Sequence, residues 1–365
     1  MLGSPVRFVD RDYVIFEGKR LLYLSGIDYH RMSNDPEILK ALSKAAFEYG
    51  ISPTGSRTTV GNHVLYVELE KKIAEFFDCE ASAVLPSGYL ANTVLLQAVA
   101  DEYDAFFLDE ASHSSIVDAA RPFGREMIYF KHLDPQSLEE SLQKQLKKNS
   151  NPLIMTDGVF PARGEIPPLD QYVEIAKRYE AKILIDDAHA MAVVGKNGMG
   201  SWEEKGADRD RIYQTGTLSK GFGVFGGLVA GGASLISAIH KKSLAFIGAT
   251  GLPLPLAAAA IKSIECLSAN RQRIADLRRR SLDLKDKFRE LGFDLPQSPA
   301  PIFSITFYDE GKNRRFYRIL LESGIYPPFL NYPGAPPGGH FRFIITSLTT
   351  DEQIGLLLDT IKSSL

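Results

Sequence analysis

Between about residue 80 and residue 230, short apolar runs alternate with segments of helical periodicity, and this alternation constrains the fold most strongly. The runs are rich in Val, Ile, Leu and Phe, and they lie at 83–85, 105–108, 127–130, 153–155 and 182–185. Amphipathic helix patterns such as 135–148 and 168–180 lie between them. Strands that alternate with helices are joined by right-handed crossovers and form a mostly parallel sheet covered on both faces. The sequence therefore predicts an α/β fold.

The rest of the chain predicts an arm and a second domain around this sheet. Residues 1–35 form the expected N-terminal arm, and a large domain at 36–250 begins with a helix that starts at a proline and ends before a glycine. A proline-marked break at 252–255 precedes a long charged helical region at 256–291. Strand and helix patterns separated by a proline-rich loop follow, and they predict a small α+β domain within 251–365.

Composition excludes several classes of protein. The 365 residues carry 42 Lys+Arg against 45 Asp+Glu, a net charge of −3, and no basic stripe that would neutralise a phosphate backbone. We therefore expect no nucleic-acid partner. No uncharged apolar stretch reaches the roughly 18 residues of a membrane span, and residues 1–7 are not expected to begin a signal peptide. The two widely separated cysteines indicate reduced thiols, so a cytoplasmic enzyme is expected.

Candidate functional residues follow the apolar runs, because ligands of open α/β sheets bind beyond the carboxyl ends of the strands. Asp186 directly follows the run at 182–185, and His189 comes three residues later. A carboxylate placed there puts a negative charge in an apolar crevice, with a hydrogen-bonding imidazole beside it. Taken alone, an aspartate at a strand end more often caps the following loop.

Lys220 lies in a glycine-rich stretch that also contains Thr217. This lysine could contact a phosphate, but the residue order of a phosphate-binding P-loop is absent. It could equally form a Schiff base, with the glycines letting the backbone approach a planar cofactor closely. Glycines by themselves more often mark a turn.

Two further groups complete the set. Ser87, Gly88 and Tyr89 stand where a strand leads into a helix, and backbone amides at a helix start bind anions. His113 follows another apolar run, where its ring could stack on a flat ligand, although alone it would be a capping or surface histidine. A phosphorylated pyridine aldehyde would use all four groups at once: the helix start, the imidazole, Asp186 and the amine of Lys220. One cofactor therefore explains the whole pattern.

These motifs resemble the α-oxoamine synthases, acyltransferases of aminotransferase fold type I that depend on pyridoxal 5′-phosphate (PLP). The resemblance covers roughly residues 20–360 and rests on motifs in family order, namely Gly55-Ser56-Arg57, Ser87-Gly88-Tyr89, Ser112-His113-Ser114, Asp157-Gly158-Val159-Phe160, Asp186-Asp187-Ala188-His189, Thr217-Leu218-Ser219-Lys220 and Phe341-Arg342-Phe343. It implies fold type I, with a mostly parallel sheet in the large domain. It also implies condensation of an amino acid with an acyl-CoA thioester, with decarboxylation, in the manner of 8-amino-7-oxononanoate synthase.

The resemblance assigns a role to each candidate residue. It implies that Lys220 carries PLP as a Schiff base and takes the Cα proton, and that Asp186 pairs with the pyridine nitrogen. The remaining implied roles are these: His189 contacts the ring hydroxyl, His113 stacks on the ring, Ser87, Gly88, Tyr89 and Thr217 lie at the phosphate end, and Arg342 binds the substrate carboxylate. Thr250 is expected to reach the phosphate from a neighbouring subunit, which implies a homodimer with shared active sites. We expect no metal in the site.

The chain departs from the family on the substrate side. Pro161 replaces a serine that contacts the ring hydroxyl, Arg163 replaces an acidic residue, and Met191 follows where glycine is usual. The asparagine of the family's Asn-Tyr-Leu-Gly stretch is replaced around Ile27-Asp28-Tyr29. Another fold-type-I enzyme such as an aminotransferase, and a PLP-binding homologue without catalysis, therefore stay open as alternatives.

Overall fold

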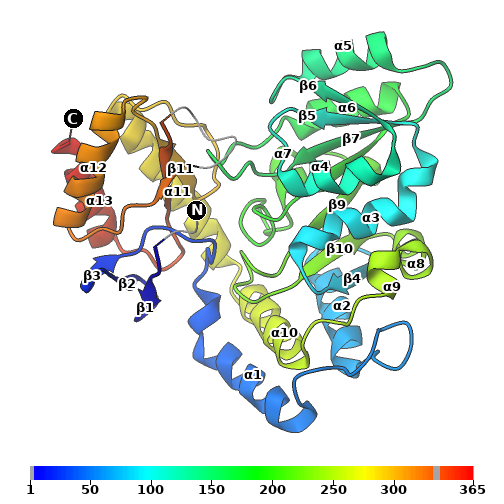
Figure 1. Cartoon of the computed structure of the whole chain (residues 1–365), viewed down its shortest axis with the longest axis horizontal. Coiled ribbons are helices and arrows are strands. Elements are labelled where there is room, and N and C mark those ends of the chain that lie inside the picture. Colours follow the sequence, from blue (N-terminus) through cyan, green and yellow to red (C-terminus); the bar gives the residue numbers. More distant parts are fainter. Residues whose placement is uncertain (1–3, 332–337, 365) are drawn as a thin grey trace.

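A seven-stranded sheet forms the centre of the protein (Figure 1), in a computed structural model that describes residues 4–331 and 338–364. Its strand order is β4-β10-β9-β8-β7-β5-β6, and every strand is parallel to its fellows except β10, which runs antiparallel to both neighbours. The strands are β4 Ala81–Leu85, β5 Ala105–Asp109, β6 Glu126–Phe130, β7 Pro152–Asp157, β8 Lys182–Asp186, β9 Ile212–Thr217 and β10 Gly227–Gly231. The predicted α/β class with a mostly parallel sheet is confirmed.

Helices cover both faces of this sheet. In β5, Phe106 packs with α3, α4 and α8 on one face, whereas the next residue, Phe107, packs with α5 and α6 on the other. Alternate side chains of one strand are thus buried in different cores, which explains why the runs in the sequence are continuously apolar. The helices around the sheet are α1 Pro36–Tyr49, α2 Val64–Phe76, α3 Ala91–Val99, α4 Ser114–Ala120, α5 Pro135–Gln145, α6 Leu169–Arg178, α7 Ser201–Lys205, α8 Ala233–Lys242, α9 Leu244–Ile247 and α10 Leu254–Ala269.

The expected continuous helical region at 256–291 is instead two helices, α10 and α11 (Gln272–Glu290). Asn270 ends α10 with φ −136°, outside the helical range. The break lets α10 pack against α1 and α2 while α11 packs into a different core around Phe288. The exposed side of α11 carries ion pairs such as Arg279 to Asp283 at 3.3 Å, as a solvated charged face should.

A smaller α+β unit, with antiparallel strands, is built from both ends of the chain. Its sheet has the order β11-β13-β12, and its core includes Leu22 and Leu24 from the N-terminal segment. Leu22 donates its N–H to the carbonyl of Gly324 at 2.8 Å. Its elements are β1 Arg7–Phe8, β2 Tyr13–Phe16, β3 Lys19–Leu22, β11 Ile302–Ile305, α12 Glu310–Glu322, β12 Phe329–Leu330, β13 His340–Ile344 and α13 Asp351–Lys362. The predicted domain limits at 36 and 250 stay predictions.

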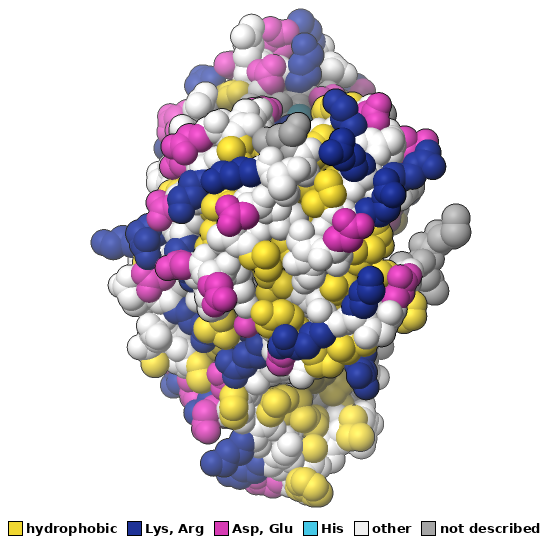
Figure 2. All heavy atoms as spheres, turned by 90° about the vertical axis from the view of Figure 1, so that its left-hand side faces the viewer, with side chains coloured by type: hydrophobic (Ala, Val, Ile, Leu, Met, Phe, Trp, Pro, Cys, Tyr) yellow, Lys and Arg dark blue, Asp and Glu magenta, His cyan; other side chains and the backbone are white. Residues whose placement is uncertain are grey.

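The outer face of this smaller unit mixes charges of both signs with apolar side chains (Figure 2). Within the described ranges, no helix combines the length and the hydropathy that crossing a bilayer requires.

Candidate active site

Eight of the ten predicted site residues line one cavity of about 170 Å³ at the carboxyl edge of the sheet. They lie at the carboxyl ends of β8 and β9 or in the segments that follow β4, β5, β8 and β9, and they are Ser87, Gly88, Tyr89, His113, Asp186, His189, Thr217 and Lys220. Residues separated by more than 130 positions in the sequence thus meet because parallel strands end at the same edge.

Asp186 is the last residue of β8 and is held in place by neighbouring donors. Asn92 donates from Nδ2 to Asp186 Oδ2 at 2.7 Å, and the N–H of Ala188 donates to Oδ1 at 3.0 Å. Asn92 is itself fixed, because the hydroxyl of Thr215 donates to its Oδ1 at 2.6 Å. Asp186 is only 7% exposed, so this support keeps a buried carboxylate in one orientation.

Lys220 lies in the loop that joins the antiparallel strands β9 and β10. Burial lowers the pKa of its amine to about 8, although Asp186 and Asp157 act in the opposite direction. A Cβ on Gly221 would come within 2.3 Å of the Met191 carbonyl oxygen, so glycine is needed for the loop to pass this close. The loop therefore presents an amine that is partly unprotonated near neutral pH, as a nucleophile or base requires.

His113 is fixed at the start of α4. Its backbone N–H donates to Asp157 Oδ2 at 2.8 Å, and its ring Nδ1 lies 2.8 Å from the Ser115 hydroxyl. Burial lowers the pKa of His113, with Asp186 opposing the shift, so the ring is neutral and suited to stacking on a flat ligand. Asp157 is a second acid in the cavity, and burial followed by the charge of Asp186 raises its pKa well above the usual value.

The segment from Ser87 to Tyr89 forms a tight start to the helical region that becomes α3. Ser87 caps this turn, with its hydroxyl accepting from the N–H of Tyr89 at 3.3 Å. A Cβ on Gly88 would lie 2.6 Å from Thr217 Cβ, so the two segments touch only because residue 88 is glycine. Backbone amides and hydroxyls converge here, which suits a phosphate.

His189 contacts a residue to which the sequence assigned no role. Its Nδ1 lies 2.6 Å from the hydroxyl of Tyr29, which belongs to the segment before α1 and is fully buried. Burial lowers the pKa of His189 well below the usual value, and the charges of Lys220 and Arg342 lower it further. His189 is therefore a neutral imidazole.

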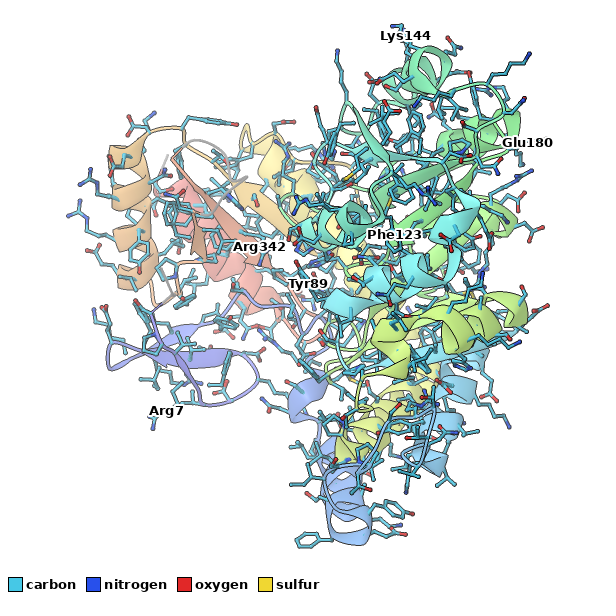
Figure 3. The ribbon with its side chains drawn as sticks, turned by 45° about the vertical axis from the view of Figure 1, so that its right-hand side comes forward. Arg7, Tyr89, Phe123, Lys144, Glu180 and Arg342 are labelled. Carbon is cyan, nitrogen blue, oxygen red and sulfur yellow. The ribbon has the colours of Figure 1, made fainter. Side chains whose placement is uncertain are left out.

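Two predicted residues lie outside the lining of the cavity. Arg342 is on β13 of the smaller unit, and Figure 3 shows it with Tyr89 where that unit meets the larger one. Its Nη1 donates to the carbonyl of Pro161 at 3.3 Å, and its buried Nε has no hydrogen-bond partner among the described residues. Thr250 is exposed and pairs with Ser56 through an isolated antiparallel bridge.

One departure from the family has a packing explanation. Met191 is fully buried, and a Cβ on Gly216 would lie 2.3 Å from its sulfur atom. The larger side chain at 191 therefore occupies space that Gly216 leaves free in β9. Met191 thus packs in the core, and it does not line the cavity.

Comparison with known proteins assigns the chain to a family. The model of the aminotransferase class I and II family matches residues 21–361. The chain belongs to this family. This chain is similar to two curated relatives named 8-amino-7-oxononanoate synthase. The protein of Fervidobacterium nodosum is 36% identical over 95% of this chain and 89% of its own length. The protein of Symbiobacterium thermophilum is 35% identical over 97% of this chain and 89% of its own length.

Solved structures agree with the assignment of this chain to the family. The serine palmitoyltransferase of Sphingomonas wittichii superposes with a TM-score of 0.92 at 27% identity, covering 98% of this chain and 90% of that one. The 8-amino-7-oxononanoate synthase of Francisella tularensis, at 23% identity, has the same fold, with a TM-score of 0.79 over 94% and 97% of the two chains. The predicted resemblance to α-oxoamine synthases, the fold type and the prediction of an enzyme of this kind are confirmed.

Proposed function

We propose that this protein is a PLP-dependent acyltransferase that joins an amino acid to the acyl group of an acyl-CoA, with loss of CO₂. The observation that carries the proposal is one cavity that contains both the amine of Lys220, with its lowered pKa, and the buried carboxylate of Asp186. The names of the curated relatives and a serine palmitoyltransferase solved with PLP support the same cofactor and reaction class.

The donor set of the cavity fits PLP. Ser87, Gly88 and Thr217 would hold the phosphate, and His113 would stack on the ring while Asp186 receives the ring nitrogen. When bound, PLP supplies a conjugated ring that accepts the electron pair left behind when a bond to the amino acid Cα breaks.

The chain's own groups would then bind, orient and move protons. The carboxylate of Asp186 holds a proton on the ring nitrogen, which strengthens the attraction of the ring for electrons. The amine of Lys220 takes the proton from Cα as a general base. The guanidinium of Arg342 binds the substrate carboxylate and fixes the orientation of the Cα bonds.

We also propose that the active unit is a homodimer to which Thr250 contributes across the interface. Thr250 is exposed and does not line the cavity of its own chain. The elements α1, α2 and α10 pack together, and α1, α2 and the segment between them carry strongly exposed apolar side chains. These include Phe47 at 94%, Val60 at 84%, Ile51 at 73% and Val64 at 69% exposure. A second copy would cover them. The cytoplasmic location stays a prediction.

An aminotransferase is the alternative, favoured by the name of the matching family model. It would use Lys220, Asp186 and Arg342 in the same way and would need no thioester. Incubation of the purified protein with a panel of amino acids, and with either acyl-CoAs or 2-oxo acids, distinguishes the two. Release of free CoA supports the proposal, whereas transfer of the amino group alone contradicts it.

The cofactor assignment has its own test. Borohydride reduction of the PLP-loaded protein should fix the cofactor covalently, and the variant Lys220→Ala should show no such attachment. Lys285→Ala serves as a control, because Lys285 is also a buried lysine but lies in α11 and donates to the carbonyls of Ser298 and Ala300. Covalent cofactor retained in Lys220→Ala would overturn the assignment.

A further inference from the structure

We propose that Tyr29 is a positioning residue that sets the tautomer of His189, so that Nε2 carries the proton and faces the cavity. The inference rests on the proposed function only for the identity of the group that receives this proton. The contact joins two distant segments, because Tyr29 precedes α1 and His189 follows β8. The oxygen of Tyr29 and Nδ1 of His189 are 2.6 Å apart, and Tyr29 is 0% exposed.

The direction of this hydrogen bond follows from the surroundings of the phenol. Burial raises the pKa of Tyr29 far above its usual value, so the hydroxyl keeps its hydrogen. Within residues 4–331 and 338–364, the only hydrogen bond recorded for this hydroxyl is the one to His189. Arg342 lies nearby, but its guanidinium has only hydrogen-bond donors and cannot accept the hydroxyl hydrogen. The hydroxyl therefore donates, and Nδ1 accepts, because a buried hydroxyl hydrogen without an acceptor is costly.

An accepting Nδ1 leaves the single proton of a neutral imidazole on Nε2. His189 is neutral, since burial and the cations Lys220 and Arg342 lower its pKa. Its Nε2 forms no recorded hydrogen bond with the described residues, and His189 lines the cavity. The imidazole therefore offers a donor to an oxygen bound there. For PLP, that oxygen is the hydroxyl on the ring.

The departure at Pro161 makes this donor more important in this chain. Where the family resemblance implies a serine hydroxyl, Pro161 has no side-chain donor, and its carbonyl accepts from Arg342. His189 is then the expected side-chain donor to the ring hydroxyl. Tyr29 is held for this task by its own backbone, because its carbonyl accepts from the N–H of Ser347 at 2.9 Å. The backbone of Tyr29 is thus anchored to the smaller unit, while its hydroxyl reaches His189 of the larger one.

The test is ¹⁵N NMR of histidine-labelled protein, measured without PLP and then with it. Two-bond nitrogen–proton correlations distinguish the two neutral tautomers and the cation, and the variant His189→Gln identifies the signals of His189 among the seven histidines. We expect protonated Nε2 in the natural chain. We expect a mixture of tautomers in Tyr29→Phe, which keeps the ring and removes the hydroxyl. Protonated Nδ1 in the natural chain would overturn the proposal, even if Tyr29→Phe failed to fold.

Kinetics supplies the second readout. In Tyr29→Phe we expect kcat to fall about 10-fold, which corresponds to one hydrogen bond of ~1.4 kcal/mol, with KM for the amino acid and covalent PLP attachment retained. Tyr172→Phe is the matched control, because Tyr172 is an equally buried tyrosine in α6, packed in the core between α5, α6 and the sheet and absent from the cavity lining. An unchanged His189 spectrum in Tyr29→Phe would refute the inference. Failure of the natural chain to bind PLP would instead refute the proposed function.

Discussion

Replacement of Asn92 by leucine should weaken PLP binding although Asn92 does not line the cavity. Its Nδ2 donates to Asp186 Oδ2 at 2.7 Å, and Asn92 is fully buried. Leucine has a similar size and no donor. In the variant, Oδ2 of Asp186 would keep only the long contact to the Ser115 hydroxyl at 3.4 Å, so the carboxylate could rotate away from the ring nitrogen.

The expected size of the effect follows from the kind of bond that is lost. A hydrogen bond to a charged group contributes about 1.5–3 kcal/mol, so the dissociation constant of PLP should rise about 10-fold to 150-fold if that energy is lost from cofactor binding. The hydroxyl of Thr215 also loses its acceptor on Asn92, but it retains the carbonyl of Ile185 at 3.2 Å. The variant should therefore stay folded.

The assay is titration of PLP into the cofactor-free protein, followed by absorbance. Asn313→Leu provides a matched control, since Asn313 is also buried in a helix and donates to a carbonyl, that of Gly338 at 2.9 Å. The control should lose stability without a change in PLP affinity. A folded Asn92→Leu variant with the affinity of the natural chain would refute the reasoning that Asn92 orients Asp186.

Two other predictions concern the smaller unit. Arg342→Ala should raise the dissociation constant of the amino acid about 10-fold or more, because a charge-assisted contact to a carboxylate is lost, while PLP occupancy stays intact; unchanged amino-acid titrations would contradict this. Burial lowers the pKa of Lys285 to about 7. The unfolded chain should therefore bind one more proton than the folded chain from about pH 7 to about pH 10, and the free energy of unfolding should rise by about 1.4 kcal/mol per pH unit across this window. Denaturant titrations at about pH 7.5 and pH 9.5 should show this rise in the natural chain but not in Lys285→Met. An equal pH dependence of the free energy of unfolding in the two proteins would contradict the prediction.

The sheet and the position of the site could be predicted because both depend on local pattern. Apolar runs identify parallel strands, and the residues after them meet at one edge, which predicts that Asp186 and His113 lie together. Lys220 could be found from its glycine-rich stretch. The antiparallel direction of β10 could not be predicted in this way, because the run 227–231 looks the same in either direction. Its direction depends on the short loop that carries Lys220.

The supporting residues were harder to find because they act through other side chains. Asn92 lies in the mostly apolar segment 91–99, but Thr93 and Gln97 lie there as well, so a polar side chain at 92 was only a weak signal. The sequence carried an even weaker signal for Tyr29, since its partner His189 is 160 positions away and a buried tyrosine is usual in any core. Such pairs depend on the tertiary fold and leave no periodic pattern.

The sharing of one core by Leu22, Leu24 and the C-terminal elements has a consequence for biosynthesis. Leu22 and Leu24 leave the ribosome well before their partners on β11, β13 and α13 have been synthesised. The large sheet can form during translation, whereas the smaller unit cannot be completed until α13 has been synthesised. A fragment cut near residue 250 would lack the strands that complete it, and its exposed leucines would favour aggregation.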